Sequence, residues 1–306
     1  MHIAHVGLGR VGRPTVYSIL SAGLPDELTV CDIKPGLAQA FGEELRHAAA
    51  SLRSDTIINY RTDSKEISNA DIILISAGVS RLPGEKISRR DLAVKNTKIV
   101  GGISESTKTN NPQAKYVVIT NPVDSMAMLC KKITNAEFVI STGTSLESAR
   151  LRSKVAYDLN VPISSIQGFA GGEHGEAALS LWSTIRIAGD TLMKYAQKTG
   201  KSLDKNRVEQ YMREVSRGII EGVGATEIGP AAVFTEIVKA ITKNTDQVIS
   251  VSTPMNFPSI SMPVFVGVPI KLGSCLGPSL YNYLLDEEKT GIQDAAKAIY
   301  DTFISS

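Results

Sequence analysis

The first twelve residues constrain the fold of this chain most strongly, because a short apolar stretch leads directly into three spaced glycines. Residues 2–6 have the character of a strand, and Gly7, Gly9 and Gly12 follow in the spacing G-x-G-x-x-G. In this spacing the first glycine permits a tight turn, the second lets the backbone approach a phosphate, and the third lets the next helix pack closely on the strand. The helix N-terminus then offers free N–H groups to an anion. The spacing therefore predicts a site for a nucleotide pyrophosphate.

The residues around these glycines strengthen a signal that is weak on its own. Pro14 falls in the first turn of the expected helix, where its missing N–H costs nothing. A second apolar stretch at 28–31 leads to Asp32, which follows Gly12 by 20 residues. An acid at about this separation meets the adenosine ribose hydroxyls and repels a 2′-phosphate. We therefore expect NAD as the cofactor, with NADP left open by Lys34 two positions later.

The first half of the chain alternates between strand-like and helical stretches. The strand-like stretches lie at 2–6, 28–31, 72–76, 116–120 and 137–141. This alternation predicts an α/β fold in which a parallel sheet has helices on both faces. Ligands of such sheets bind at the carboxyl ends of the strands, so the loops that follow the strands are the candidate site.

The pattern changes near Gly143, where longer helical stretches and short strands replace the alternation. Helices are expected from about Leu146, near 204–221, near 230–243 and from about 286. We therefore expect a doubly wound parallel sheet in a dinucleotide-binding domain over residues 1–142. A C-terminal α+β domain over residues 143–306 would bind the substrate and carry the catalytic groups.

Charge and cysteine content argue against several classes of protein. A formal net charge of +2 gives no strong field, so we expect neither nucleic acid nor a membrane as a partner. Cys31, Cys130 and Cys275 are widely spaced and form no C-x-x-C pair, which argues against disulfides and against a metal site. No apolar stretch reaches about 18 residues, and the first residues do not have the pattern of a signal peptide. We expect a cytoplasmic protein.

Several chemically capable side chains lie in the loops that follow the expected strands. Of the four histidines only His174 is flanked by glycines, in G-G-E-H-G. An exposed loop histidine with an ordinary pKa of about 6.5 can donate or accept a proton near neutrality. Arginines follow two other strands and can bind carboxylates bidentately. One group of these arginines lies in a loop that could close over a substrate. Together they predict a substrate with more than one acidic or carbonyl oxygen.

These segments resemble the malate and lactate dehydrogenase superfamily in their order and approximate spacing. The resemblance rests on G-L-G-R-V-G, A-G-V-S-R-L-P-G, S-R-R-D-L, T-N-P-V-D, L-E-S-A-R and G-E-H-G. It extends over nearly the whole chain, since F-V-G-V-P-I-K-L-G at 265–273 is also similar to the carboxyl-terminal part of the family. The resemblance implies a Rossmann domain that binds NAD, a small dicarboxylate substrate, and assembly as a homodimer or homotetramer.

The resemblance also implies a role for each residue that matches a motif. His174 would be the proton donor and acceptor, and Arg150 would hold the C1 carboxylate of the substrate. Arg89 would be the lid arginine that polarises the substrate carbonyl, and Asn121 would bridge substrate and nicotinamide. Arg81 stands where malate dehydrogenases carry a specificity arginine. The methyl group of pyruvate would leave that cation unpaired, so the sequence favours interconversion of (S)-malate and oxaloacetate.

The sequence departs from the family at two places in the site. Glu147 stands where the family usually pairs an aspartate with the histidine, and it keeps the charge while adding a methylene group. We expect Glu147 to orient His174, with Glu173 as the alternative. The lid is about two residues longer than usual, which leaves Arg90 open beside Arg89 as the lid arginine.

We expect the cofactor to be held by the glycine-rich loop, the acid after the second strand and two asparagines. These residues are Gly7, Leu8, Gly9, Arg10, Val11, Gly12, Asp32, Asn96 and Asn121. Thr226, in G-A-T-E-I-G, is a further candidate for the substrate pocket.

A lactate-type or broad-specificity 2-hydroxy acid dehydrogenase is the alternative enzyme. A nucleotide-binding protein that has lost turnover is the alternative from another class.

Overall fold

The first half of the chain forms a parallel sheet covered by helices on both faces. The computed structural model describes residues 1–79, 89–175 and 177–305, with the backbone alone at 89–92. The elements of this half are β1 (His2–Val6), α1 (Gly12–Ser21), β2 (Glu27–Cys31), α2 (Leu37–Leu52), β3 (Ile57–Arg61), β4 (Ile72–Ile75), α3 (Arg89–Lys108), β5 (Lys115–Val118), α4 (Val123–Thr134) and β6 (Val139–Ser141). The strands lie in the order β3-β2-β1-β4-β5-β6, and all of them pair in parallel. The predicted doubly wound sheet is confirmed.

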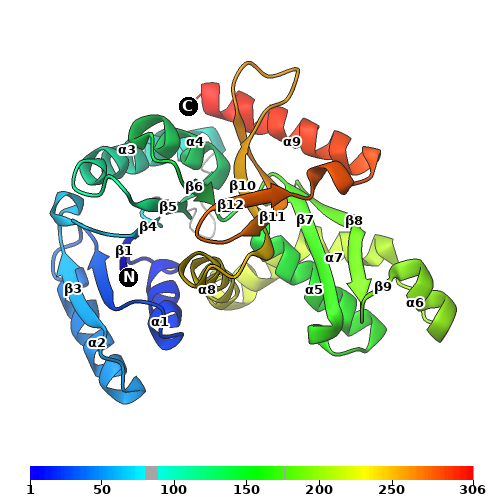
Figure 1. Cartoon of the computed structure of the whole chain (residues 1–306), viewed down its shortest axis with the longest axis horizontal. Coiled ribbons are helices and arrows are strands. Elements are labelled where there is room, and N and C mark those ends of the chain that lie inside the picture. Colours follow the sequence, from blue (N-terminus) through cyan, green and yellow to red (C-terminus); the bar gives the residue numbers. More distant parts are fainter. Residues whose placement is uncertain (80–88, 176, 306) are drawn as a thin grey trace.

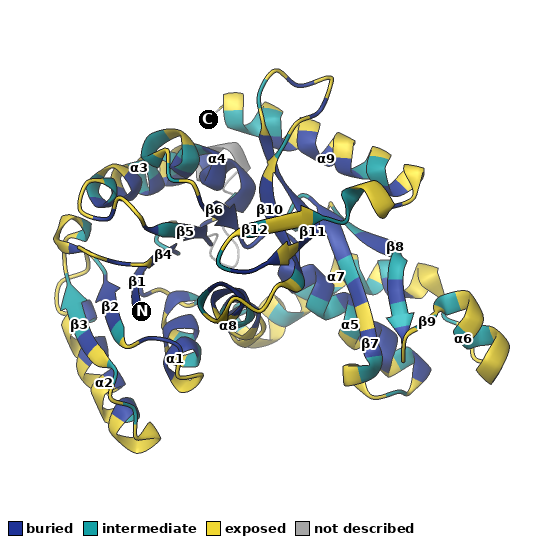
Figure 2. Cartoon of the chain, in the orientation of Figure 1, coloured by how far each residue is buried: buried dark blue, intermediate teal, exposed yellow. Residues whose placement is uncertain are grey.

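The apolar composition of the central strands explains their place in this sheet. All four residues of β4, I-I-L-I, are buried, as are all five of β1, because helices cover both faces of the sheet. In Figure 2 the central strands are dark blue, whereas the outer surfaces of the helices are largely yellow. The carboxyl ends of β1, β4, β5 and β6 therefore meet at one edge, where the loops of interest begin.

One strand of the sheet, β3, was not predicted from the sequence. It lies at the edge of the sheet beside β2, and Ile57 is exposed while Asn59, Tyr60 and Arg61 are half-buried. An edge strand with one covered face has no need for a continuous apolar stretch, and I-I-N-Y-R has none. The fourth and fifth expected strands exist, with bounds of Lys115–Val118 and Val139–Ser141.

The second half of the chain is built from antiparallel strands and long helices. Its elements are α5 (Ser145–Leu159), β7 (Ile166–Gly172), β8 (Ala178–Ile187), β9 (Asp190–Thr191), α6 (Leu192–Thr199), α7 (Lys205–Val223), α8 (Ile228–Lys243), β10 (Gln247–Met255), β11 (Val264–Leu272), β12 (Leu276–Ser279) and α9 (Asp286–Ile304). The strand order is β10-β11-β7-β8-β9, with β12 paired to β11. The predicted α+β character of this half is confirmed (Figure 1).

The two halves meet in one continuous sheet. β6 pairs with β10 through Ser141 and Ser252, so the strands of the described residues form a single sheet of twelve. Gly143 follows directly with a φ of +49°, and a Cβ there would lie 2.5 Å from the backbone nitrogen of Ser252. Only glycine fits this close approach, so the chain turns from one half into the other at Gly143. We keep 1–142 and 143–306 as the proposed domain limits.

None of the helices in the described parts of the chain combines the length and the apolar composition that a membrane span needs.

Candidate active site

The glycine-rich loop between β1 and α1 is shaped by packing at two of its glycines and is open at the third. A Cβ on Gly7, which has a φ of +102°, would lie 2.3 Å from the backbone nitrogen of Ala77, and one on Gly12 would lie 2.0 Å from the carbonyl oxygen of Gly7. A Cβ on Gly9 would meet no described atom within 4 Å. The backbone at Gly9 is therefore exposed where a phosphate can approach it.

The start of α1 adds an anion-binding feature to this loop. Val11 is the N-cap residue, and its side chain makes no capping hydrogen bond. In the first turn the Arg13 N–H already donates to the carbonyl oxygen of Gly9 at 3.2 Å and Pro14 has no N–H, so Gly12 contributes the helix N–H that can bind an anion such as a pyrophosphate. Leu8 is buried and Val11 is half-buried. These features fit the phosphates of a dinucleotide.

Asp32 lies beside this loop at the carboxyl end of β2. Its Oδ2 accepts the Leu8 N–H at 2.8 Å, and its Oδ1 accepts the Lys34 N–H at 2.9 Å. Two backbone donors thus fix a carboxylate next to the phosphate-binding turn. In this position it can bind ribose hydroxyls and repel a 2′-phosphate.

Asn96 and Arg10 are two expected cofactor residues that the structure joins to other parts of the chain. Asn96 is fully buried, and its amide accepts the Val79 N–H at 2.7 Å and donates to the carbonyl oxygens of Val79 and Asn121 at 3.1 and 2.6 Å. It therefore fixes the loops after β4 and β5, and its contact with the cofactor stays a prediction. The exposed side chain of Arg10 donates to the carbonyl oxygen of Gly224 at the end of α7, at 2.8 Å.

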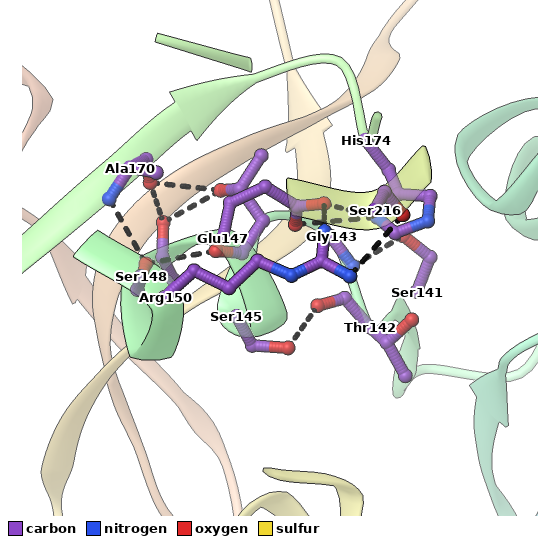
Figure 3. Close-up of polar contacts among 12 residues, drawn as sticks. Ser141, Thr142, Gly143, Ser145, Glu147, Ser148, Arg150, Ala170, His174 and Ser216 are labelled. Carbon is purple, nitrogen blue, oxygen red and sulfur yellow. Dashed lines mark hydrogen bonds and ion pairs between the residues drawn. The ribbon is translucent and has the colours of Figure 1, made fainter. Parts of the chain in front are cut away.

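His174 and Glu147 form a buried ion pair beneath the turn between β7 and β8. The Nδ1 of His174 lies 3.3 Å from each carboxylate oxygen of Glu147, which is in the first turn of α5 (Figure 3). The Glu147 side chain is 3% exposed and the His174 side chain 22%. The expectation of an exposed loop histidine is therefore wrong, since the ring lies against the buried carboxylate of Glu147 and most of its surface is covered. With Nδ1 facing Glu147, Nε2 is the ring nitrogen left to act on a substrate.

Arg150 completes this cluster from the same helix. It lies three residues after Glu147, and this spacing places both side chains on one face of α5. Its Nη1 is 3.7 Å from the Oε1 of Glu147, and its Nη2 donates to the hydroxyl of Ser216 on α7 at 3.3 Å. The side chain is 12% exposed. A guanidinium carries five N–H donors, so others remain for a substrate carboxylate.

The charges in this cluster determine its protonation. Burial raises the pKa of Glu147, but the charge and hydrogen bond of His174 and the charge of Arg150 outweigh it, so the pKa is lowered. Burial lowers the pKa of His174, but Glu147 and the charge of Asp124 outweigh it and raise the pKa to about 9. The pKa of His174 is thus above the ordinary value that the sequence suggested. The ring is held as an imidazolium at neutral pH.

The structure describes the remaining expected residues in differing detail. Asn121 is exposed at the carboxyl end of β5, and Thr226 is half-buried between α7 and α8. The backbones of Arg89 and Arg90 begin α3, and Arg81 lies outside the described residues. Within the described ranges, no group of three or more His, Cys, Asp or Glu side chains is arranged to hold a metal ion.

Sequence reasoning missed one buried acid that contacts the histidine. Asp124 lies in the first turn of α4, is 3% exposed, and its Oδ2 accepts the backbone N–H of His174 at 3.2 Å. The available signal was an acid in T-N-P-V-D, three residues after Asn121, at the start of a helix that is buried over most of its length. Local sequence gives no indication that this acid meets a turn 50 residues away.

Comparison with known proteins agrees with this arrangement over almost the whole chain. Residues 1–138 match the NAD binding domain of lactate/malate dehydrogenases, and residues 144–301 match their alpha/beta C-terminal domain. A malate dehydrogenase of Sulfurisphaera tokodaii is 36% identical over 301 residues, which cover 98% of this chain and 94% of that protein. An L-lactate dehydrogenase of Staphylococcus epidermidis is 30% identical, with 98% and 95% covered.

A solved structure shares the same fold. A lactate dehydrogenase from a Medee basin deep-sea metagenome library superposes with a TM-score of 0.92 at 24% identity, covering 99% of this chain and 98% of that one. The matched family models, together with the glycine-rich loop, define an oxidoreductase that binds NAD. The chain belongs to the lactate/malate dehydrogenase family, and NAD is its cofactor.

Proposed function

We propose that this protein interconverts (S)-malate and oxaloacetate, with His174 as the proton donor and acceptor. The observation that carries the proposal is the cluster of an imidazole, a buried carboxylate and a guanidinium. His174 and Arg150 both pair with Glu147, at 3.3 and 3.7 Å. An acid–base group beside a carboxylate-binding group is what a 2-hydroxy acid requires.

Each residue of the cluster has a distinct part in this chemistry. The glycine-rich loop and Asp32 would hold NAD, which would supply the hydride chemistry at C2 of the substrate. His174 takes the proton of the C2 hydroxyl during oxidation and gives it back during reduction. Glu147 stabilises the imidazolium and holds the ring orientation. Arg150 binds the C1 carboxylate and so fixes C2 near the histidine.

The lid supplies two further groups in this proposal. Arg89 polarises the carbonyl at C2 and stabilises its developing negative charge, while closure excludes water. Arg81 pairs with the second carboxylate, which oxaloacetate has and pyruvate lacks. Two malate dehydrogenases at 36% and 35% identity support this choice of substrate.

A lactate-type or broad-specificity 2-hydroxy acid dehydrogenase is the second candidate. It is favoured by L-lactate dehydrogenases that are 28% to 32% identical to this chain. The two candidates share every group of the cluster and differ at the end of the substrate that faces Arg81. One assay therefore separates them.

That assay measures NADH and NADPH oxidation with oxaloacetate and with pyruvate at matched concentrations. We expect NADH with oxaloacetate to give the highest kcat/KM, by at least about tenfold over each other combination. Faster reduction of pyruvate would support the second candidate. Binding of NADH without reduction of either acid would indicate a nucleotide-binding protein that lacks turnover.

Replacement of Arg81 tests the choice between the two acids directly. Arg81→Gln removes the cation that would pair with the second carboxylate, which costs about 2 to 3 kcal/mol for a charged hydrogen bond. We expect the ratio of kcat/KM for oxaloacetate over pyruvate to fall by about 30- to 150-fold. Arg81→Lys is the matched control and should retain part of the preference. An unchanged ratio in Arg81→Gln would remove Arg81 from this role.

The proposal includes assembly as a homodimer or homotetramer, as the sequence resemblance implies. Sedimentation of the purified protein tests this point.

A further inference from the structure

Three elements meet at one buried carboxylate beside the acid–base histidine. We propose that Asp124 is a positioning residue that fastens the backbone of His174 to α4, β6 and β10. This inference rests on the proposed function of His174. It concerns a residue that does not itself touch the reacting atoms.

The carboxylate of Asp124 has a donor on each side. Its Oδ1 accepts the hydroxyl of Ser141 at the end of β6 at 2.9 Å and the hydroxyl of Ser252 on β10 at 2.6 Å. Its Oδ2 accepts the backbone N–H of His174 at 3.2 Å. Asp124 and both serines are buried. Burial raises the pKa of Asp124, whereas the two serine hydroxyls, the His174 N–H and the charge of His174 act in the opposite direction. Three donors directed at one side chain favour the ionised acid, which can only accept.

The turn that carries His174 needs such an anchor. Gly172 and Gly175 lie on either side of the histidine and have φ values of +89° and +118°. Glycine adopts such values at little cost, so the backbone on both sides of His174 is weakly restrained by its own conformation. A Cβ on Gly175 would meet no described atom within 4 Å. The hydrogen bond from His174 to Asp124 fixes the backbone between these glycines, while Glu147 fixes the ring.

The same acid connects the histidine to the cofactor side of the site. Asp124 follows Asn121 by three residues at the start of α4, and Asn96 holds the carbonyl oxygen of Asn121 at 2.6 Å. The group proposed to transfer the proton and the segment proposed to face the nicotinamide are thus joined through one side chain. A shift of either relative to the other changes the geometry of the transfer, and small displacements are costly in such sites.

The charge of Asp124 adds a second effect on the histidine. Among the described residues, the charged groups that act most on His174 are Glu147, Asp124 and Arg150; the two carboxylates raise the pKa of His174, and the guanidinium lowers it. Removing the Asp124 charge without changing its shape should therefore lower the pKa of His174. This response separates a group that acts on the histidine from one that only stabilises the fold.

Asp124→Asn makes this change with little change of shape. The amide oxygen can still accept from His174, and the amide nitrogen can donate to both serine hydroxyls, which rotate to accept. We expect ¹⁵N-histidine NMR of the enzyme without substrate to show a pKa of His174 lower by on the order of half a unit. The loss of oxaloacetate reduction at high pH should shift downward by the same amount. The His174 signal is assigned by its absence in His174→Asn.

Asp124→Ala removes the anchor itself. We expect kcat for oxaloacetate reduction to fall by about tenfold, while KM changes by less than about threefold because the arginines that bind substrate are intact. If this variant fails to fold, Asp124→Asn alone decides the question.

Glu288→Gln is the matched control. Glu288 is another buried carboxylate, which accepts the backbone N–H and the hydroxyl of Ser183 at 2.9 and 2.5 Å. We expect it to lower the melting temperature while the His174 titration and the pH profile stay unchanged. Equal pH profiles for Asp124→Asn, Glu288→Gln and wild type would overturn the inference. If His174→Asn reduces oxaloacetate as fast as wild type, the proposed function fails instead.

Discussion

At the scale of single residues, the ion pair between His174 and Glu147 sets the chemistry of the site. The pKa of His174 is raised to about 9, so the protonated form that oxaloacetate reduction needs persists through neutral pH. Reduction should lose activity only as pH rises through about 9, and malate oxidation should gain activity over the same range. The same pair stabilises the fold below the ordinary histidine pKa of about 6.5 and loses that contribution as pH rises through about 9.

Glu147→Gln should reverse this shift. Without the Glu147 carboxylate, burial and Arg150 lower the pKa of His174 against the remaining charge of Asp124, so reduction should begin to decline at a lower pH than in wild type. We expect kcat to fall by about 100-fold, since the imidazolium also loses its stabilising charge. Stopped-flow measurement of NADH oxidation from pH 6 to 10 gives both quantities. Glu147→Asp, which restores the usual family residue, is the control and should keep most of the activity. A Glu147→Gln profile that matches wild type would contradict the pairing.

Most residues of this cluster could be identified from the sequence, but their burial and their contacts could not be predicted. His174, Glu147 and Arg150 stand out by residue type and motif, and the i,i+3 spacing of the last two follows from a helix. The degree of burial does not follow from local sequence. The glycines around His174 suggested an exposed loop, whereas the ring lies against Glu147, and Asp124 accepts the backbone N–H of His174. The contact between Asp124 and His174 could not be predicted for the same reason.

At the scale of elements, the turn from β1 into α1 was predicted closely because its constraints are local. Gly7 and Gly12 contact neighbouring backbone, and Gly9 leaves its backbone open. The buried side chain of His5 also stabilises this turn, through the hydroxyl of Ser76, and the glycine motif does not predict this contact. The Nε2 of His5 lies 2.8 Å from the hydroxyl of Ser76, which donates to the carbonyl oxygen of Gly7 at 2.8 Å. Burial lowers the pKa of His5 to about 3, so this histidine stays neutral.

Alanine substitutions in the turn should separate binding from folding. Gly9→Ala adds a methyl group into open space, so we expect an unchanged melting temperature and a roughly tenfold weaker NADH affinity, about 1.4 kcal/mol. Gly12→Ala places a methyl group 2.0 Å from the Gly7 carbonyl oxygen and should cost about 2 to 3 kcal/mol of stability as well. Calorimetry and fluorescence titration measure the two effects. Equal NADH affinity in Gly9→Ala and wild type would argue against phosphate binding at this loop.

At the scale of the whole molecule, the two halves share a sheet and a core. The main apolar core includes Ile3 and Ile299, residues from opposite ends of the chain. The Thr235 hydroxyl on α8 donates to that of Ser18 on α1 at 2.8 Å. In Figure 1 α1 and α8 lie side by side below the sheet. The sequence indicated two domains by a change of pattern, but pairing between β6 and β10 depends on contacts across 111 residues that no local pattern shows.

The shared core predicts cooperative unfolding of the entire chain. We expect one transition in urea, with tryptophan fluorescence reporting the second half and far-ultraviolet circular dichroism reporting both halves at the same midpoint. A fragment of residues 1–142 should not fold alone, because it exposes the faces of α1, α4 and β6 that the second half covers. Two separated transitions, or a folded fragment, would show that the halves are independent.

The central claim is that His174 transfers the proton when NAD and a 2-hydroxy acid exchange a hydride. The most direct test is the single-turnover rate of NADH oxidation by oxaloacetate at pH 7 in wild type and His174→Asn, with NADH binding measured in both. We expect equal NADH affinity and a rate at least about 100-fold lower in the variant, because proton transfer by a positioned group contributes this much. Equal rates in the two proteins would contradict the claim.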